Sequence, residues 1–143
     1  MKELEAVRGD WPAALATVIA HFKAESGTVH LMGPDGALHL KASQGIPEVV
    51  LERVRVVPVG KGMAGLAAQR KQPVTVCNLQ TDTSGDVRPG AKLTGMEGAI
   101  ASPMLAGDKV VGVLGVANRG ARTFTDEEEA GLMEAGRVMG EWA

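Results

Sequence analysis

The chain has 143 residues, of which 45% are hydrophobic and 22% are charged, as in an average globular domain and unlike a disordered, collagenous or coiled-coil chain. A formal net charge of −2, with two Trp, two Phe and no Tyr, leaves neither a basic surface nor a stacking platform for nucleic acid. We therefore expect a single domain over residues 1–143, with its core from about residue 10, and no nucleic-acid partner.

The only cysteine, Cys77, cannot form an intramolecular disulfide, so its presence does not indicate an oxidising compartment. The first five residues are charged and lack the apolar core of a signal peptide. No apolar run approaches the roughly 18 residues of a membrane-spanning helix. These features predict a cytoplasmic protein that does not associate with membranes.

The first predicted element is a helix over residues 10–25. Asp10 is a favourable N-cap, and Pro12 falls in the first turn, where its missing N–H group costs nothing. Large apolar residues then recur at helical spacing, at Trp11, Leu15, Val18, Ile19 and Phe22.

A hairpin follows, with strands at 28–32 and 37–41 around the turn residues 33–36. A four-residue loop pairs Met32 with Ala37 and places His30 opposite His39. In this register four apolar side chains share one face, namely Val29, Leu31, Leu38 and Leu40. A transition metal between the two histidines would need a further ligand that the sequence does not offer, so we interpret them as a surface pair and expect no metal.

The rest of the chain alternates short elements with glycine-rich turns. The pattern predicts a helix at 48–53, a strand at 54–59, a helix ending near residue 72 and a strand at 74–77. A long polar stretch, 78–97, precedes strands at 98–105 and 110–117 and a final helix, before which Thr125 and Glu128 are spaced as a capping box. Strands joined by hairpins imply an antiparallel sheet, which the two terminal helices cover on one face, so the fold class is α+β.

Residues 60–65 match the pattern G-x-G-x-x-G between a strand and a helix. A dinucleotide site also needs an acidic residue after the next strand, but that strand ends at Cys77-Asn78. We therefore interpret these glycines as turn residues, with dinucleotide binding as a minor alternative. A lone cysteine is more often a small buried apolar residue than a nucleophile, so we expect no catalytic residues and no cofactor.

The order of these segments resembles a GAF domain, the small ligand-binding and signalling module of cyclic-nucleotide phosphodiesterases, phytochromes and bacterial regulators. The resemblance is carried by residues 57–67, 72–76, 101–105, 111–118 and 122–128. It implies a six-stranded antiparallel sheet with the terminal helices on one face. It also implies a ligand pocket on the other face, which the 78–97 segment would cover.

Two branches of that family can be compared with this chain. Asn118-Arg119, Phe124 and Glu128-Glu129 loosely resemble the Asn-Lys, Phe and Asp-Glu signature of members that bind cyclic nucleotides. Free methionine-(R)-sulfoxide reductases, the enzyme branch, need a nucleophilic and a resolving cysteine, whereas this chain has Cys77 alone. The resemblance therefore favours a binding module, with a cyclic nucleotide as one candidate ligand.

Three hypotheses about function remain. The first is a non-enzymatic sensory module whose pocket is formed by Asn78, Asp82, Met96, Ile100, Ser102 and Met104. The second is a homodimerisation or protein-interaction module with an empty pocket, using the apolar residues of the terminal helices: Trp11, Val18, Phe22, Met139 and Trp142. The third is a redox enzyme or sensor that depends on Cys77.

Overall fold

The computed structural model describes residues 2–87 and 89–143. Its helices are α1 (Lys2–Glu5), α2 (Trp11–His21), α3 (Glu48–Val54), α4 (Gly62–Arg70), the 3₁₀ helix η1 (Pro89–Thr94) and α5 (Asp126–Gly140). Its strands are β1 (Ser26–Met32), β2 (Leu38–Gln44), β3 (Val56–Val57), β4 (Val74–Val76), β5 (Gly98–Ala106) and β6 (Lys109–Asn118).

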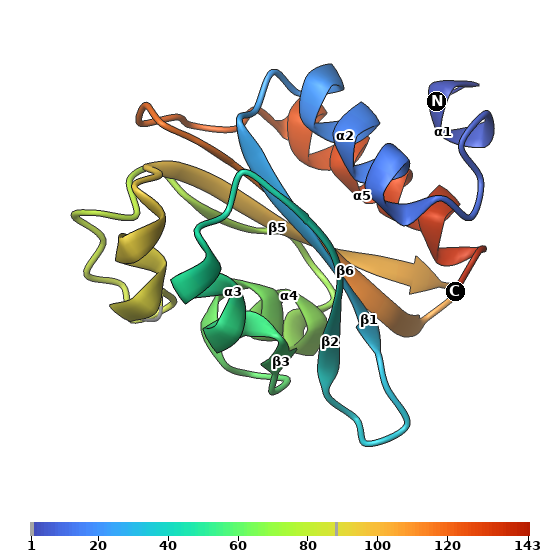
Figure 1. Cartoon of the computed structure of the whole chain (residues 1–143), viewed down its shortest axis with the longest axis horizontal. Helices are drawn as coiled ribbons and strands as arrows, with labels where there is room; N and C mark the ends of the chain where they lie inside the picture. Colours follow the sequence, from blue (N-terminus) through green and yellow to red (C-terminus); the bar gives the residue numbers. More distant parts are fainter. Residues whose placement is uncertain (1, 88) are drawn as a thin grey trace.

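The six strands form one antiparallel sheet in the order β3-β2-β1-β6-β5-β4. Two hairpins, β1-β2 and β5-β6, are joined where β1 pairs with β6, so the two halves of the chain share one sheet. Helices α2 and α5 cover one face, while α3, α4 and η1 lie on the other (Figure 1). The predicted α+β class and the six-stranded antiparallel sheet are confirmed.

Both long helices begin at the residues that the sequence predicts. The side chain of Asp10 accepts a hydrogen bond from the amide of Ala13, which caps α2. At the start of α5 the Thr125 hydroxyl accepts from the amide of Glu128, and the Glu128 carboxylate accepts from the amide of Thr125. This reciprocal capping, and then the bond from Arg122, lower the pKa of the Glu128 carboxyl.

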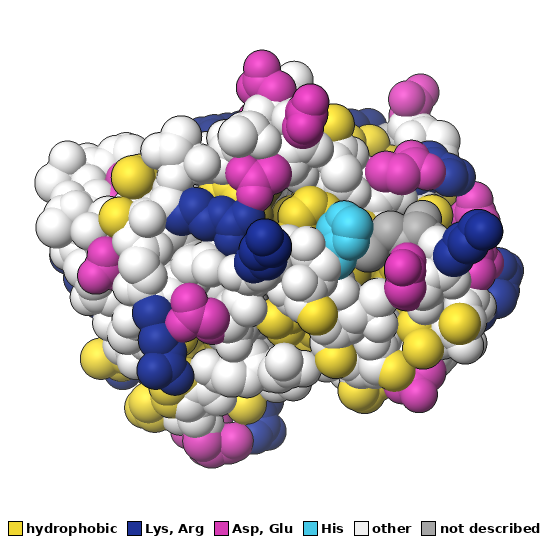
Figure 2. All heavy atoms as spheres, turned by 90° about the horizontal axis from the view of Figure 1, so that it is seen from above, with side chains coloured by type: hydrophobic (Ala, Val, Ile, Leu, Met, Phe, Trp, Pro, Cys, Tyr) yellow, Lys and Arg dark blue, Asp and Glu magenta, His cyan; other side chains and the backbone are white. Residues whose placement is uncertain are grey.

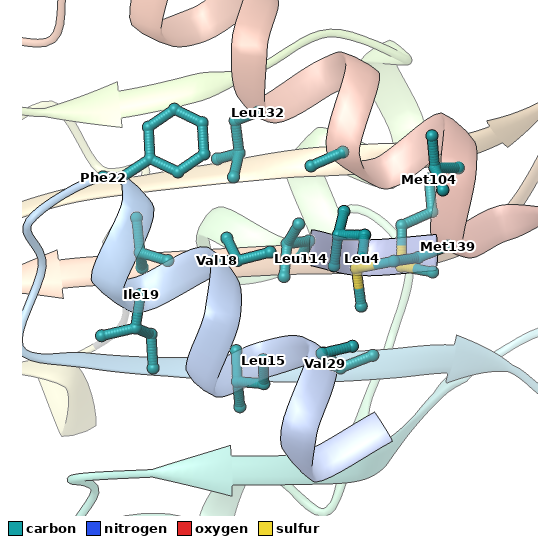
Figure 3. Packing of buried hydrophobic residues seen from close by; sticks show 14 of the residues in the cluster. Leu4, Leu15, Val18, Ile19, Phe22, Val29, Met104, Leu114, Leu132 and Met139 are labelled. Atoms are coloured by element: carbon teal, nitrogen blue, oxygen red, sulfur yellow. The ribbon is translucent and has the colours of Figure 1, made fainter. Parts of the chain in front are cut away.

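The main core lies between these helices and the sheet. Leu15 and Val18 of α2 and Leu132 and Met139 of α5 are buried against Leu114 of β6 (Figure 3). Leu4 of α1 is also fully buried in this cluster, so the core includes a residue upstream of the expected limit near residue 10. The central strands of the sheet are therefore covered on the helix side.

The apolar residues expected to form a dimer interface belong to this core. Val18, Phe22 and Met139 are at most 7% exposed, while Trp11 and Trp142 pack on each other with ring centroids 5.5 Å apart. The expected role of Val18, Phe22 and Met139 in a dimer interface is therefore wrong, because they cover the sheet of their own chain, whereas Trp11 and Trp142 are only partly buried against the same core. On the helix-covered side shown in Figure 2, charged side chains are interspersed with apolar ones.

The β1-β2 hairpin differs from prediction by one residue. His30 pairs with Leu40 and Met32 pairs with Leu38, so five residues, 33–37, separate the paired ends of the strands. Leu38 consequently faces the same side as His30, and His39 faces the other side. The prediction of a surface His30–His39 pair is wrong, because His30 is only 2% exposed and His39 instead bonds to Asp35.

Candidate functional site

A cavity of about 640 Å³ lies on the side of the sheet opposite α2 and α5. It lies between the sheet, α3, α4 and part of the 78–97 segment, and it is partly open to solvent. Small-molecule sites in proteins commonly measure about 300–1,000 Å³, so this cavity has the size of a ligand-binding site.

The floor of the cavity is made of small side chains on three neighbouring strands. Ala99 and Ala101 of β5 pair with Ala117 and Gly115 of β6, and Gly115 pairs with Thr28 of β1. Paired residues on adjacent strands project on the same face of a sheet. These side chains are too short to reach the elements above them, which leaves the space open.

The walls are mainly aliphatic. Val50 and Val54 come from α3, Met63 and Ala64 from α4, and the 78–97 segment adds Leu79, Val87, Ala91 and Thr94. The predicted cover by the 78–97 segment is thus present, and two short helices complete the enclosure. Among the described residues that line the cavity, the only aromatic ring is the imidazole of His30.

Two buried polar atoms at the floor of the cavity have no hydrogen-bond partner among the described residues: Oγ of Ser26 and Nδ1 of His30. The Nε2 atom of His30 lies 2.7 Å from the carbonyl oxygen of Val54. Because a carbonyl can only accept, Nε2 carries the hydrogen. Burial lowers the pKa of His30 below its ordinary value and so favours the neutral ring, in which Nδ1 is a hydrogen-bond acceptor.

Two charged residues of the described chain line the cavity, Arg53 of α3 and Lys61 at the start of α4, and no acidic residue of the described chain accompanies them. Both are exposed, and neither forms an ion pair within the described part of the chain. Lys61 also occupies the N-cap position of α4 without a side-chain cap. The amides of the first turn of a helix have no acceptor within the helix, so this end of the cavity favours a negative charge.

The glycines of residues 60–65 have structural roles beside this site. Gly60 and Gly62 have φ angles of +92° and +65°, which residues with a side chain rarely adopt. A Cβ at Gly65 would collide with the carbonyl oxygen of Pro58. These observations support the interpretation as turn chemistry, and the antiparallel sheet lacks the parallel strands of a dinucleotide-binding fold.

Three of the six predicted site residues, Ile100, Ser102 and Met104, share one face of β5, as their spacing requires. That face is the helix side: Ile100 and Met104 belong to the main core, and Met104 lies near Met139 of α5 (Figure 3). Ser102 is fully buried and pairs with Leu114. The expectation that this face lines the pocket is wrong, and of the three only Ile100 contributes to the cavity wall.

The other three predicted residues lie in the 78–97 segment but do not line the cavity. The side chain of Asn78 bonds to Glu97 and to the amide of Gln80. Asp82 accepts hydrogen bonds from Ser84, and Met96 is buried in a small cluster beside the cavity wall. These residues shape the segment rather than face the cavity.

Sequence reasoning missed the polar and charged residues that the structure brings together: Ser26, Thr28, His30, Arg53 and Lys61. One signal was present in the sequence. In β1, β5 and β6, small or polar residues alternate with large apolar ones, as in Ser26-Gly-Thr-Val-His and Ala99-Ile-Ala. Such alternation places small or polar side chains on one face of each strand, and these side chains leave room beside that face.

Cys77 follows β4 and is exposed, so the expectation of a buried apolar cysteine is wrong. Its sulfur lies 3.7 Å from the Thr123 hydroxyl, and it does not line the cavity. Within residues 2–87 and 89–143 no three His, Cys, Asp or Glu side chains gather where a metal ion could bind. None of the described helices is long and apolar enough to cross a membrane.

A protein-family model described as a GAF domain matches residues 12–140 of the chain. No curated protein matches the sequence significantly. Among solved structures, the GAF domain of an Acinetobacter phosphoenolpyruvate-protein phosphotransferase is 19% identical with a TM-score of 0.80, covering 98% of this chain and 87% of that one.

Two further structures show the range of proteins with this fold. A GAF domain region of a putative membrane protein from Geobacter sulfurreducens is 16% identical, with a TM-score of 0.78, and the match covers 99% of this chain and 95% of that one. A free methionine-R-sulfoxide reductase from Neisseria meningitidis, solved in complex with its substrate, is 18% identical, with a TM-score of 0.76, over 96% of this chain and 82% of that one. At these identities the likeness concerns the fold.

Proposed function

The chain belongs to the GAF domain family, and from this premise we propose that it is a non-enzymatic sensory module that binds a small molecule in the cavity described above. The observation that carries the proposal is the cavity of about 640 Å³, with the unpartnered Ser26 Oγ and His30 Nδ1 at its floor. An unsatisfied buried polar group costs about 1–3 kcal/mol. A ligand that pairs with both atoms removes this cost on binding.

The placement of the cavity also supports a sensory role. Its walls come from α3, α4 and the 78–97 segment, which pack on the sheet but are not strands of it. A ligand that contacts these elements favours the arrangement in which they close around it, and thereby shifts the population of conformations. We propose that this shift is the signal that the module transmits.

Native mass spectrometry of the freshly purified protein tests the proposal, first without additions and then with cyclic AMP and cyclic GMP as probes. We expect a small molecule to be retained or added. The variant Gly115→Val places a side chain into the cavity from a position where a Cβ meets only ordinary contacts, and it should abolish binding. Ala16→Val, on the exposed side of α2, is the control that should bind normally. A wild-type protein that retains nothing and binds neither probe contradicts the proposal.

A reductase function is the main competing hypothesis, because structures of free methionine-R-sulfoxide reductases share the fold. Such a function would place a thiol against the substrate, whereas Cys77 is exposed and does not line the cavity. We therefore expect no reduction of free methionine sulfoxide in the presence of dithiothreitol. Reduction by the wild type that Cys77→Ser abolishes would replace our proposal.

The proposal does not depend on assembly. A homodimer through α2 and α5 would have to use their outer residues, since the predicted contacts Val18, Phe22 and Met139 are buried. Light scattering at micromolar protein concentration measures the oligomeric state directly. We propose a cytoplasmic location, which the unpaired Cys77 favours.

A further inference from the structure

We infer that the ligand is a small aliphatic acid that also carries a hydrogen-bond donor, with the acidic group near Lys61 at the start of α4 and the donor on Nδ1 of His30. This inference rests on the proposed function and names the chemical class of the ligand. It combines three properties of the cavity, namely the charge at one end, the acceptor at the floor and the aliphatic walls.

The cationic residues of the cavity indicate where the acidic group of the ligand binds. Among the described residues that line the cavity, only Arg53 and Lys61 are charged, and both are cationic. The uncapped N-terminus of α4 adds amides that have no acceptor within the helix. A cation beside Lys61 would face a like charge and the positive end of the helix dipole, so a carboxylate or another small anionic group is the group that fits.

His30 indicates that the ligand carries a hydrogen-bond donor. Its Nε2–H group is already used by the carbonyl oxygen of Val54, and in the neutral ring the remaining nitrogen, Nδ1, is an acceptor. His30 is 2% exposed and its Nδ1 has no partner among the described residues. A hydroxyl or amino group satisfies this atom, whereas an ether or a carbonyl does not. Ser26, with its unpartnered hydroxyl at the same floor, can accept from or donate to the same ligand group.

The cavity walls indicate that the rest of the ligand is aliphatic. Ile46, Val50, Val54, Met63 and Leu79 provide branched and flexible aliphatic side chains. Besides the imidazole of His30, no aromatic ring of the described residues lines the cavity. A ligand that depends on stacking therefore gains less here than an aliphatic chain, whose burial contributes about 0.8 kcal/mol per CH₂ group.

Three probes of the same length test the class by isothermal titration calorimetry. 2-Hydroxyhexanoate carries both groups, hexanoate lacks the donor, and 1,2-hexanediol lacks the charge. We expect 2-hydroxyhexanoate to bind at least about tenfold more tightly than either of the others, since hydrogen bonds to charged groups contribute about 1.5–3 kcal/mol. Equal binding of the diol overturns the anionic end, and equal binding of hexanoate overturns the role of His30.

Nuclear magnetic resonance of the histidine rings tests the donor without a mutation. The chain has three histidines, so their ring nitrogens are resolvable in a long-range ¹H–¹⁵N spectrum. We expect 2-hydroxyhexanoate to shift the Nδ1 signal of His30 and hexanoate to leave it nearly unchanged. A Nδ1 signal that does not move in the saturated complex overturns the assignment.

Lys61→Gln tests the anionic end, with Lys109→Gln at the exposed start of β6 as the matched control. We expect Lys61→Gln to weaken 2-hydroxyhexanoate at least about fivefold, in line with a charge-assisted hydrogen bond, and to leave the diol unaffected. An equal effect of both variants overturns the local role of Lys61.

Further probes separate the failure of this inference from failure of the proposed function. Inorganic phosphate bound as tightly as 2-hydroxyhexanoate would overturn the need for an aliphatic body. If cyclic AMP or a retained molecule binds in a manner that Gly115→Val abolishes, while all three six-carbon probes fail, the ligand class is wrong and the proposed function stands. If nothing binds, both are wrong.

Discussion

The two faces of the sheet use neighbouring residues of the same strands in opposite ways. On the helix side, Leu114 and Val116 of β6 are buried among side chains of α2 and α5. On the cavity side, Gly115 and Ala117 of the same strand line a space of about 640 Å³. One face is therefore closely packed by two long helices, whereas part of the other, beside a smaller buried cluster that includes Leu38 and Val113, keeps room for a ligand.

Buried side-chain atoms without a partner occur on both faces. Oγ of Ser26 and Nδ1 of His30 belong to residues that line the cavity, whereas Oγ of Ser102 and Nε1 of Trp142 lie on the helix side. The difference between the faces is therefore one of packing, and comparable substitutions should have different effects on the two faces.

The largest effect is expected for Leu114→Ala on the helix side. Leu114 is fully buried in the main core, and truncation of a buried leucine costs about 2–5 kcal/mol, since it leaves a void that the structure fills only in part. Urea denaturation monitored by circular dichroism measures this loss. Val113→Ala, on the cavity side of the same strand, is the comparison and should cost less. A larger loss for Val113→Ala would contradict the assignment of the two faces.

Gly27→Ala should be the next most harmful. A Cβ at Gly27 would lie 2.7 Å from the carbonyl oxygen of Gly115 and 3.1 Å from Ile19 and Leu15. Overpacking of this kind costs about 1–3 kcal/mol, because the backbone of β6 and the side chains of α2 both have to shift. Measuring the free energy of unfolding of Gly27→Ala tests this prediction. An unchanged value would show that the helix side is more loosely packed than described.

The pH dependence of stability should reveal the buried histidine. Burial lowers the pKa of His30 below its ordinary value of 6.5, so the unfolded chain takes up the proton first as the pH falls. The contribution of the neutral ring is complete above about pH 6.5 and is lost below it, at no more than about 1.4 kcal/mol per pH unit.

Unfolding free energies at pH 7.5 and 5.5 measure this slope. His30→Gln should have a smaller difference between the two pH values than the wild type, while His21→Gln, at the exposed end of α2, should keep the wild-type difference. If the His30 variant loses as much stability on acidification as the wild type, the ring is not the group responsible.

The smallest effect is expected for Gly115→Ala on the cavity side. The added Cβ meets Thr28 at 3.5 Å and the carbonyl oxygen of Ile100 at 3.6 Å, which are ordinary contacts. Since glycine in a strand is destabilising relative to alanine by roughly 0.5–1 kcal/mol, stability should stay the same or rise slightly. A loss comparable to that of Gly27→Ala would contradict the difference between the faces.

Local features of the fold could be predicted from the sequence, because they depend on residues close together in the chain. The Asp10 cap of α2 and the Thr125–Glu128 capping box are formed as predicted. The β1-β2 register was not, since both faces of that hairpin are partly buried and the apolar pattern tolerates a shift of one residue. The predicted strand 54–59 is reduced to Val56–Val57, because α3 continues to Val54.

The candidate site was less predictable than the fold. Period-two spacing correctly grouped Ile100, Ser102 and Met104, but β5 is buried on both faces, so nothing in the strand itself indicates which face α5 covers. His30 fits the alternating pattern of its strand, and no neighbouring residue in the sequence indicates that its side chain is buried. Arg53 and Lys61 come from separate helices and meet the strands only in the folded chain.

The sequence by itself determined where helices begin, where the chain turns and that the class is α+β, since capping, glycine conformations and strand alternation act over a few residues. Only the tertiary structure decided which face of the sheet is filled and which is hollow. That choice depends on where α2 and α5 dock, and docking is set by the summed burial of residues from both ends of the chain. The site occupies the face that these helices leave uncovered.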